Sequence, residues 1–227
     1  MFCIQQSHKG TIESKALNLY SVFESYPCVY FQKTSEVERY ATENPLVKPL
    51  IPVGTIQWFK SVTKWDITPN YYPDFLHQYL GRKVWQTSEW PLNEKVFIKP
   101  ADVPKRFDGF VTRGGYHKKK RGPYWCSEVV TFVNEWRYYI SGGKIVYARW
   151  YLGLSGEEVP VPELNIDWPS EWVGSVDFGL TNDGRLLLIE AHEPYSVGWY
   201  GTLNDYKIYA QWLRDGFEYM TKIRNLE

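Results

Sequence analysis

The stretch Ser175-Val-Asp-Phe-Gly-Leu-Thr-Asn-Asp-Gly-Arg-Leu-Leu-Leu-Ile-Glu-Ala-His192 decides the fold. Its two apolar runs flank Asp183-Gly184, and because this dipeptide accepts positive φ, the stretch predicts a β-hairpin. A two-residue turn at Asp183-Gly184 makes the numbers of cross-strand partners sum to 367. Asp177 and Glu190 then face each other, with their Cβ atoms roughly 5 Å apart.

Facing carboxylates on this hairpin require a cation nearby, since like charges opposite each other are destabilising. Oxygen ligands suit a hard divalent ion such as Mg²⁺, which commonly carries substrate phosphates. A solvated acidic patch and neutralisation by a nearby arginine are the alternatives, and a one-residue register slip would separate the pair. His192 is expected beside Glu190, because side chains alternate along a strand. Leu187, Ile189 and Ala191 are expected to bury on the opposite face.

A second hairpin is predicted upstream, with strands at 132–140 and 145–152 around Ser141-Gly-Gly-Lys144. Glu135 and Arg137 share one face of its first strand. They are either a structural ion pair or a nucleotide-facing pair, in which Glu135 accepts from ribose hydroxyls and Arg137 contacts phosphates.

The flanking segments complete an α+β pattern. The N-terminal 92 residues are proline-rich and predict a small lobe, with strands at 27–31 and 53–59 and a short helix at 74–80. A strand is predicted at 95–99, and apolar residues at three-to-four spacing predict an amphipathic helix over 203–223. Strand pairs with a terminal helix are typical of an antiparallel α+β fold.

Basic residues follow the strand at 95–99. Lys99 stands at its end, where a lysine either reaches a phosphate as a point charge or is solvated. Lys105 lies in the turn-forming stretch Asp102-Val-Pro-Lys-Arg-Phe-Asp-Gly109. The basic segment 113–121 suits a phosphate-covering loop, a contact with nucleic acid or an acidic partner, or a solvated loop. It lacks the spacing of a P-loop.

Composition narrows the class of protein. The 227 residues carry 26 basic and 26 acidic side chains, and this neutral balance disfavours nucleic-acid binding. Three cysteines without a paired motif argue against a zinc site and indicate a reducing compartment. No secretory signal or membrane-length apolar stretch is visible, so we expect a cytoplasmic protein without a membrane partner.

The motifs together resemble the ATP-grasp superfamily, most closely a clade of phages and bacteria named for an arginine and two lysines. The resemblance covers nearly the whole chain and is strongest from 95 to 201. It rests on a set of short segments: Val96-Phe-Ile-Lys-Pro100, Asp102–Gly109, Ser127–Arg137 with its Glu-Trp-Arg end, Val176-Asp-Phe-Gly179 and Leu188-Ile-Glu-Ala-His192. Two more segments resemble the clade's N-terminal lobe: Ile51-Pro-Val-Gly-Thr55 and Leu80-Gly-Arg-Lys-Val-Trp85.

The resemblance implies an α+β ATP-grasp fold. In this fold two antiparallel-sheet lobes hold the nucleotide between them, and a small N-terminal lobe precedes them. The implied boundaries are 1–92 for the N-terminal lobe, 93–130 for the small ATP-grasp lobe, and 131–227 for the large lobe with the metal site.

The resemblance also implies roles for individual residues. Those expected to contact ATP are Lys99 and Lys105 at the phosphates, Glu128, Val129 and Val130 at the adenine, Glu135 at the ribose, and Arg82. Arg137 and Lys105 are the expected catalytic groups, and Mg²⁺ is expected on Asp177, Glu190 and His192. The family usually has asparagine at the position of His192. Imidazole is a softer ligand than an amide oxygen, so Mn²⁺ or reduced catalysis is an alternative.

The implied activity is ATP-dependent ligation of a small-molecule or peptide carboxylate to an amine through an acylphosphate. Ser196-Val-Gly-Trp-Tyr200 is either a rim for the acceptor or a loop that packs Trp199 on the core. Two other functions are kept open: a nucleotide-binding pseudoenzyme acting through protein contacts, which His192 favours, and a nucleic-acid-binding module built on 113–121. The oligomeric state is left open.

Overall fold

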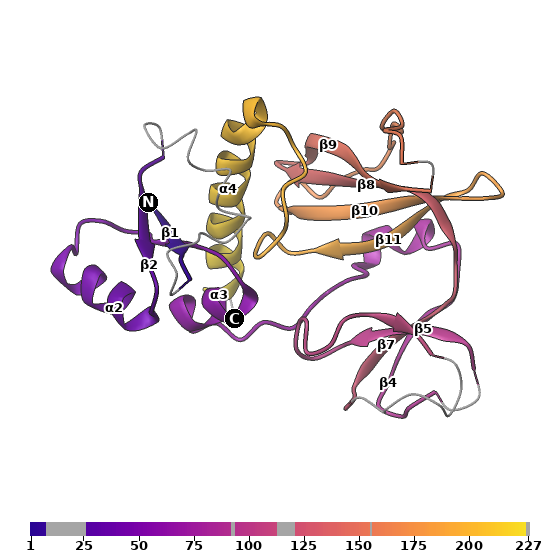
Figure 1. Ribbon diagram of the computed structural model, residues 1–227, viewed down its shortest axis with the longest axis horizontal. Coiled ribbons are helices and arrows are strands. Elements are labelled where there is room, and N and C mark those ends of the chain that lie inside the picture. Colours follow the sequence, from indigo (N-terminus) through magenta and orange to yellow (C-terminus); the bar gives the residue numbers. More distant parts are fainter. Residues whose placement is uncertain (8–25, 92–93, 113–120, 155, 226–227) are drawn as a thin grey trace.

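The computed structural model describes residues 1–7, 26–91, 94–112, 121–154 and 156–225, which form three sheets with flanking helices (Figure 1). The N-terminal sheet has β1 (Phe2–Gln5) between β2 (Cys28–Phe31) and β3 (Ile51–Val53), all parallel. Parallel pairing here was not expected from the sequence. β2 and β3 can run in the same direction because α2 (Thr34–Glu43) lies in the connection between them, and strands that run in parallel need such a long crossover.

The predicted strand at 53–59 is wrong, because most of it lies in helix α3 (Ile56–Thr63). Thr55 caps this helix, and its side-chain oxygen accepts from Trp58 N at 3.2 Å. Ile56 and Phe59, three residues apart, are buried in one core cluster. A short apolar run is compatible both with a strand and with a buried helix, and here the Thr55 cap favours the helix.

The large sheet has the order β11-β10-β8-β9 and is antiparallel throughout. Its strands are β8 (Phe132–Ser141), β9 (Lys144–Gly153), β10 (Gly174–Thr181) and β11 (Leu186–His192), which confirms both predicted hairpins. Alternation along β8 buries Trp136 and Tyr138 in the core on one face. Glu135 and Arg137 therefore lie on the other face.

The turn between β10 and β11 is longer than predicted. Thr181 N donates to Arg185 O at 2.9 Å, so three residues form the loop, and Gly184 takes a φ of 83°. This loop would shift every cross-strand pair by one residue. A bulge on β11 cancels the shift, because Phe178 pairs with Leu188 whereas Asp177 pairs with Glu190. The predicted pairing of the two carboxylates is thus confirmed, although the two-residue turn is wrong.

The bulge also changes which residues of β11 bury. Leu188 and Ala191, on either side of it, lie in the same core cluster. Ile189 is the extra residue of the bulge and is only partly buried. Leu187 and Ala191 are buried as expected, but the expectation is wrong for Ile189, since strict alternation fails where a residue is inserted.

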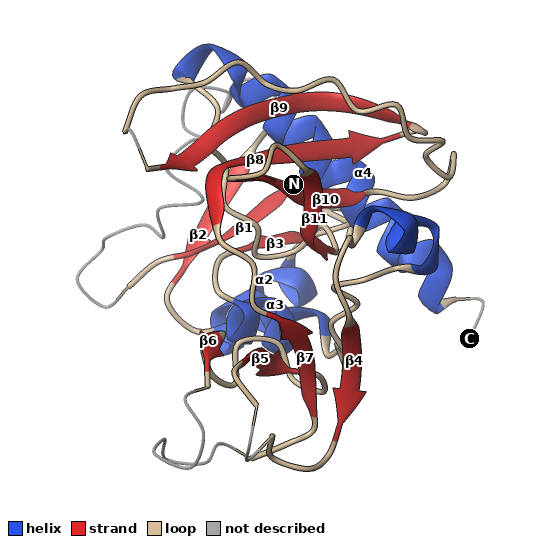
Figure 2. Ribbon diagram, turned by 90° about the vertical axis from the view of Figure 1, so that its right-hand side faces the viewer, coloured by secondary structure: helices blue, strands red, loops and turns tan. Residues whose placement is uncertain are grey.

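The small sheet lies below the large sheet in Figure 2 and has the order β4-β7-β5-β6, also antiparallel. Its strands are β4 (Val84–Thr87), β5 (Val96–Pro100), β6 (Phe110–Val111) and β7 (Tyr124–Glu128). β4 precedes residue 93, so this sheet takes one strand from the segment expected in the N-terminal lobe. The predicted short helix is the 3₁₀ helix η2 (Asp74–Tyr79), whose Leu76 packs in the core of the large sheet.

The terminal helix α4 (Tyr206–Arg224), preceded by η3 (Leu203–Asp205), stands between the N-terminal sheet and the large sheet (Figure 1). Tyr209 and Trp212 pack in one cluster with Phe2 of β1 and Tyr139 of β8. Trp212 Nε1 donates to the carbonyl of Ile140 at 3.1 Å. The predicted amphipathic helix is confirmed. Among the helices that the structure describes, none combines the length and apolar character needed to cross a membrane.

Candidate nucleotide and metal site

The two antiparallel sheets meet where Lys99 contacts Glu190. Lys99 comes from the end of β5 and Glu190 from β11, and Lys99 Nζ donates to Glu190 Oε2 at 2.7 Å. The lysine is only 5% exposed. Lys99 is therefore buried against a carboxylate, which excludes the alternative that its side chain is solvated.

Glu190 has a second partner in His192, as expected from their shared face. His192 Nε2 lies 2.8 Å from Glu190 Oε1, and because a carboxylate only accepts, this nitrogen carries the proton. Burial would raise the pKa of Glu190, but the charge of Lys99 and the contacts with His192 hold it well below its usual range. Glu190 is therefore an anion held between two donors.

Asp177 is paired with Arg137 of the neighbouring strand β8. The guanidinium donates from Nε to Oδ1 and from Nη2 to Oδ2, both at 2.7 Å, which is the strong bidentate geometry. The two side chains are almost fully buried, at 2% and 9% exposure. For Asp177 the structure thus shows neutralisation by an arginine, one of the two alternatives to a metal. It also rules out a Glu135–Arg137 ion pair, since Arg137 turns to Asp177.

Tyr151 joins this cluster and was missed from the sequence. Its hydroxyl lies 2.6 Å from Glu135 Oε2 and 3.3 Å from Asp177 Oδ2, so its one proton serves either carboxylate. Burial raises the pKa of Tyr151 far above its usual range, which keeps the hydroxyl protonated. Register shifts along β8 and β9 pair Glu135 with Leu152. A hairpin without register shifts around Gly142-Gly143 would pair Glu135 with Trp150, so no pattern in the sequence predicted the contact with Tyr151.

The first cavity at this junction, the inter-sheet cavity, measures about 210 Å³ and lies between the two antiparallel sheets. Six of the seven residues expected to contact ATP line it: Arg82, Lys99, Glu128, Val129, Val130 and Glu135. Phe97, Val111 and Phe132 add apolar walls. Apolar walls with a few converging polar groups are typical of a cofactor site.

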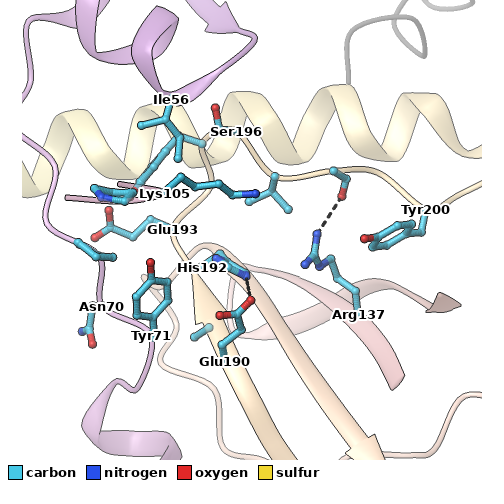
Figure 3. Close-up of a pocket in the computed structure, with 16 residues that line it drawn as sticks. Ile56, Asn70, Tyr71, Lys105, Arg137, Glu190, His192, Glu193, Ser196 and Tyr200 are labelled. Atoms are coloured by element: carbon cyan, nitrogen blue, oxygen red, sulfur yellow. Dashed lines mark hydrogen bonds and ion pairs between the residues drawn. The ribbon is translucent and has the colours of Figure 1, made fainter. Parts of the chain in front are cut away.

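The second cavity, the loop cavity, measures about 270 Å³ and lies beside the loop from β11 to α4 (Figure 3). Lys105, Arg137 and His192 line it, and Glu190 lines both cavities. The structure therefore places the two expected phosphate lysines in different cavities. Lys105 adopts a positive φ of 55° in its turn.

The segment 196–200 packs Trp199 on the core, as one interpretation of its sequence predicted, and it also lines the loop cavity. Its role as a rim for the acceptor stays a prediction. Trp199 is buried in the core and stacks on Tyr209 of α4 at 4.9 Å between centroids. Ser196 and Tyr200 line the loop cavity, and Tyr200 stacks on Tyr151 at 4.8 Å. The carbonyl of Gly198 accepts from Arg137 Nη1 at 3.4 Å. One loop thus fixes the core and forms a cavity wall.

A metal ion could be held by the three residues expected to bind it. Donor atoms of Asp177, Glu190 and His192 lie within 4.8 Å of one another. Two carboxylates suit Mg²⁺, and an imidazole adds affinity for Mn²⁺. Each group already has a hydrogen-bond partner, and those partners include the cations Lys99 and Arg137. The donor set fits a divalent ion once these cations turn to another anion such as a phosphate.

Arg82 holds the bulge of β11. Its guanidinium donates to the carbonyls of Leu188 at 2.6 Å and Ile189 at 3.1 Å, and also to Leu80 at 3.1 Å. A bulge leaves backbone groups without ladder partners, and the planar fork of arginine satisfies two of them at once. Burial lowers the pKa of Arg82. Its side chain therefore supports Glu190 through the backbone, and it also lines the inter-sheet cavity.

Replacing Arg82 by methionine is expected to lower the free energy of unfolding by about 1–3 kcal/mol, because the bulge carbonyls lose their charged donor. Urea denaturation measures this change. Arg214→Met is a matched control, since Arg214 is half-exposed and pairs with Glu218 on the surface. Equal effects of the two variants would show that Arg82 does not support the bulge.

Two further features lie in other parts of the chain. The basic segment 113–121 lies outside the described residues except for Arg121, so the structure does not describe the proposed basic loop. Cys126 is buried in the core of the small sheet, and burial raises the pKa of its thiol to about 11. Cys126 is therefore a packed thiol, held in its protonated form by burial.

The fold and the site define an ATP-grasp protein. The chain belongs to an ATP-grasp domain family, family 2 of the R-2K clade, whose sequence profile matches residues 75–210. The comparison with curated proteins found no match.

Three solved structures to which the chain is similar share little sequence with it. The D-alanine–D-alanine ligase from Bacillus anthracis is 10% identical, with a TM-score of 0.46 over 99% of this chain and 98% of the ligase. The macrocyclase MdnC from Microcystis aeruginosa, bound with the precursor peptide MdnA, is 10% identical, with a TM-score of 0.44 over 95% and 99%. The ATP-grasp ligase PsnB, complexed with a minimal precursor, is 11% identical, with a TM-score of 0.37 over 60% of this chain and 55% of PsnB.

Proposed function

We propose that the protein is an ATP-dependent carboxylate–amine ligase that works through an acylphosphate. The observation that carries the proposal is the contact between Lys99 and Glu190 at the junction of both cavities. A lysine suited to phosphate and a carboxylate suited to a divalent ion come from opposite sheets and meet at one point. A nucleotide between the sheets would place its phosphates there.

In this proposal the inter-sheet cavity holds the nucleoside part of ATP. The backbone of Glu128–Val130 faces the adenine, and Glu135 accepts from the ribose hydroxyls. Burial raises the pKa of Glu135, while its hydrogen bond from Tyr151 and the charge of Arg137 oppose this shift. Arg82 acts at this cavity mainly by fixing the backbone beside Glu190.

Asp177, Glu190 and His192 would hold Mg²⁺ or Mn²⁺, which supplies charge neutralisation at the phosphate oxygens. Lys99 turns from Glu190 to the phosphates, which frees the carboxylate. Arg137 and Lys105 face the loop cavity, where they stabilise the negative charge that develops as the phosphoryl group is transferred. Positioning and charge neutralisation are the main contributions expected of a protein to phosphoryl transfer.

The proposed reaction has two steps. A carboxylate oxygen in the loop cavity attacks the γ-phosphorus, the bond to the ADP oxygen breaks, and an acylphosphate forms. An amine nitrogen then attacks the carbonyl carbon, inorganic phosphate leaves with the bonding pair, and the amine loses a proton. We propose a peptide or an amino acid as the carboxylate, with the loop 196–200 as the rim for the amine.

A nucleotide-binding pseudoenzyme is the second candidate, and a specific observation favours it. Both carboxylates are already neutralised by protein cations, Asp177 by Arg137 and Glu190 by Lys99. A site balanced in this way needs no metal for stability. ATP binding that does not change with divalent metal, together with an absence of ADP release, would support this candidate over the ligase.

Calorimetric titration with ATP is expected to show binding in Mg²⁺ or Mn²⁺ and strongly weakened binding in EDTA, because Lys99 and Arg137 alone then offset the charges of the phosphates and of Asp177 and Glu190. Adenosine is the control ligand. Its affinity should not depend on the metal, since it reaches only the inter-sheet cavity. ATP affinity that is equal with and without metal contradicts the proposed metal site.

A further inference from the structure

The ammonium group of Lys99 is enclosed by two tyrosine rings. Its Nζ lies 3.6 Å from the ring centroid of Tyr71 and 4.6 Å from that of Tyr72. Among the described residues, Glu190 is its one hydrogen-bond acceptor. Because an ammonium group has three N–H donors, two of them are left to the ring faces and to an incoming ligand.

The two tyrosines are themselves fixed to different sheets. The carbonyl of Tyr71 accepts from Ala191 N of β11 at 2.8 Å, and its ring forms a T-shaped contact with the ring of His192, at 6.1 Å between centroids. The ring of Tyr72 forms a T-shaped contact with Trp125 of β7, at 5.0 Å between centroids. Tyr71 therefore contacts the large sheet and its neighbour Tyr72 contacts the small sheet, at the place where Lys99 reaches from β5 to the large sheet.

Tyr71 lines the loop cavity and Tyr72 lines the inter-sheet cavity. In Figure 3 the hydroxyl of Tyr71 points into the loop cavity, away from the backbone of its own segment. Burial and the nearby charge of Glu190 raise the pKa of Tyr71 well above its usual range, so it stays neutral. Together with Lys99 and Glu190, the two tyrosines form the wall between the two cavities.

We propose that Tyr71 and Tyr72 are positioning residues that hold the Lys99 ammonium for the phosphates of a bound nucleotide. This inference rests on the proposed function. A ring face attracts a cation over a broad range of directions, whereas a carboxylate requires a directed hydrogen bond. The ammonium can thus turn from Glu190 to a phosphate oxygen without leaving the rings. Because Lys99 is buried, the attraction is of the stronger, desolvated kind.

The test compares leucine and phenylalanine variants of both tyrosines by titration with ATP and with adenosine. Tyr71→Leu is expected to weaken ATP binding on the order of 10-fold and to leave adenosine binding unchanged, since a lost cation–π contact acts only on the phosphates. Tyr72 also lines the inter-sheet cavity, so Tyr72→Leu is expected to weaken ATP binding on the order of 10-fold more than it weakens adenosine binding. Tyr71→Phe and Tyr72→Phe keep the rings and should bind ATP as the wild type does. Equal ATP binding in the leucine variants, or an equal loss for adenosine, overturns the inference.

A second measurement does not depend on nucleotide binding and separates this inference from the proposed function. The urea midpoint is measured for Tyr71→Leu, for Lys99→Met, and for the double variant. If the ring holds the ammonium, Lys99→Met should shift the midpoint less in the Tyr71→Leu background than in the wild type. Additive shifts overturn the inference. A wild type that binds no ATP but shows non-additive shifts overturns the proposed function and the role toward phosphates, while the hold of the tyrosine rings on the ammonium stands.

Discussion

Alanine in place of Asp177 is expected to lower the free energy of unfolding by about 3–5 kcal/mol, even without metal or nucleotide, because it leaves the Arg137 guanidinium buried without its counter-ion. Arg137 makes two 2.7 Å bonds to Asp177, and its contact with the Gly198 carbonyl is long, at 3.4 Å. Urea unfolding followed by tryptophan fluorescence measures the change. Asp177→Asn should lose less, since one oxygen still accepts from the guanidinium.

Asp66→Ala is the matched control for this prediction. Asp66 also pairs with a cation, Lys60, but it is fully exposed, and surface ion pairs contribute little. The double variant Asp177→Ala/Arg137→Met should recover part of the lost stability, because no uncompensated charge remains. If Asp177→Ala costs no more than Asp66→Ala, the buried pair does not form in solution.

Glutamine in place of Glu190 is expected to reduce ATP turnover by about 100-fold or more, because the negative charge that would bind a divalent ion at the phosphates is lost. The fold should survive this change. The amide oxygen still accepts from Lys99, and His192 can change tautomer to accept from the amide nitrogen. ADP release measures turnover, and near-UV circular dichroism reports whether the tertiary structure is retained.

Glu218→Gln serves as the control, since Glu218 lies on the exposed face of α4 and pairs with Arg214. Full turnover by a folded Glu190→Gln variant would contradict both the metal assignment and the mechanism. If the wild type releases no ADP with any carboxylate and amine tested but still binds ATP, the pseudoenzyme becomes the better description.

The two variants differ in what they report. Asp177 is paired with Arg137 inside the protein, so its removal acts first on stability, and a loss of activity would not isolate a role in metal binding. Glu190 lines both cavities, and its amide analogue keeps its neighbours in place. Glu190→Gln is therefore the sharper test of the site.

Local sequence patterns were enough to predict the elements that carry the site. Glycine-containing turns and alternating apolar residues indicated both hairpins, and three-to-four spacing indicated α4. The facing pair Asp177 and Glu190 was also predicted. That success depended on two unseen offsets, a longer turn and a bulge, which cancel at this pair.

Six of the seven residues that the motifs predicted to contact the nucleotide line the inter-sheet cavity. The motifs did not show that Lys105 faces the other cavity, or that Tyr71, Tyr72 and Tyr151 complete the cluster. Tyr151 reaches Glu135 because of a register shift within the large sheet, whereas Tyr71 and Tyr72 reach Lys99 from the segment before η2, where the two sheets meet. A tyrosine carries no local mark of either kind of contact.

By itself, the sequence determined which segments become hairpins and helices and which faces carry charge, since backbone periodicity and turn residues act over a few positions. Only the tertiary structure decided which charges meet. The order of strands places Arg137 beside Asp177, and the approach of two sheets places Lys99 against Glu190, 91 residues away. Strand order and the packing of sheets depend on the whole core, so no short stretch of sequence encodes them.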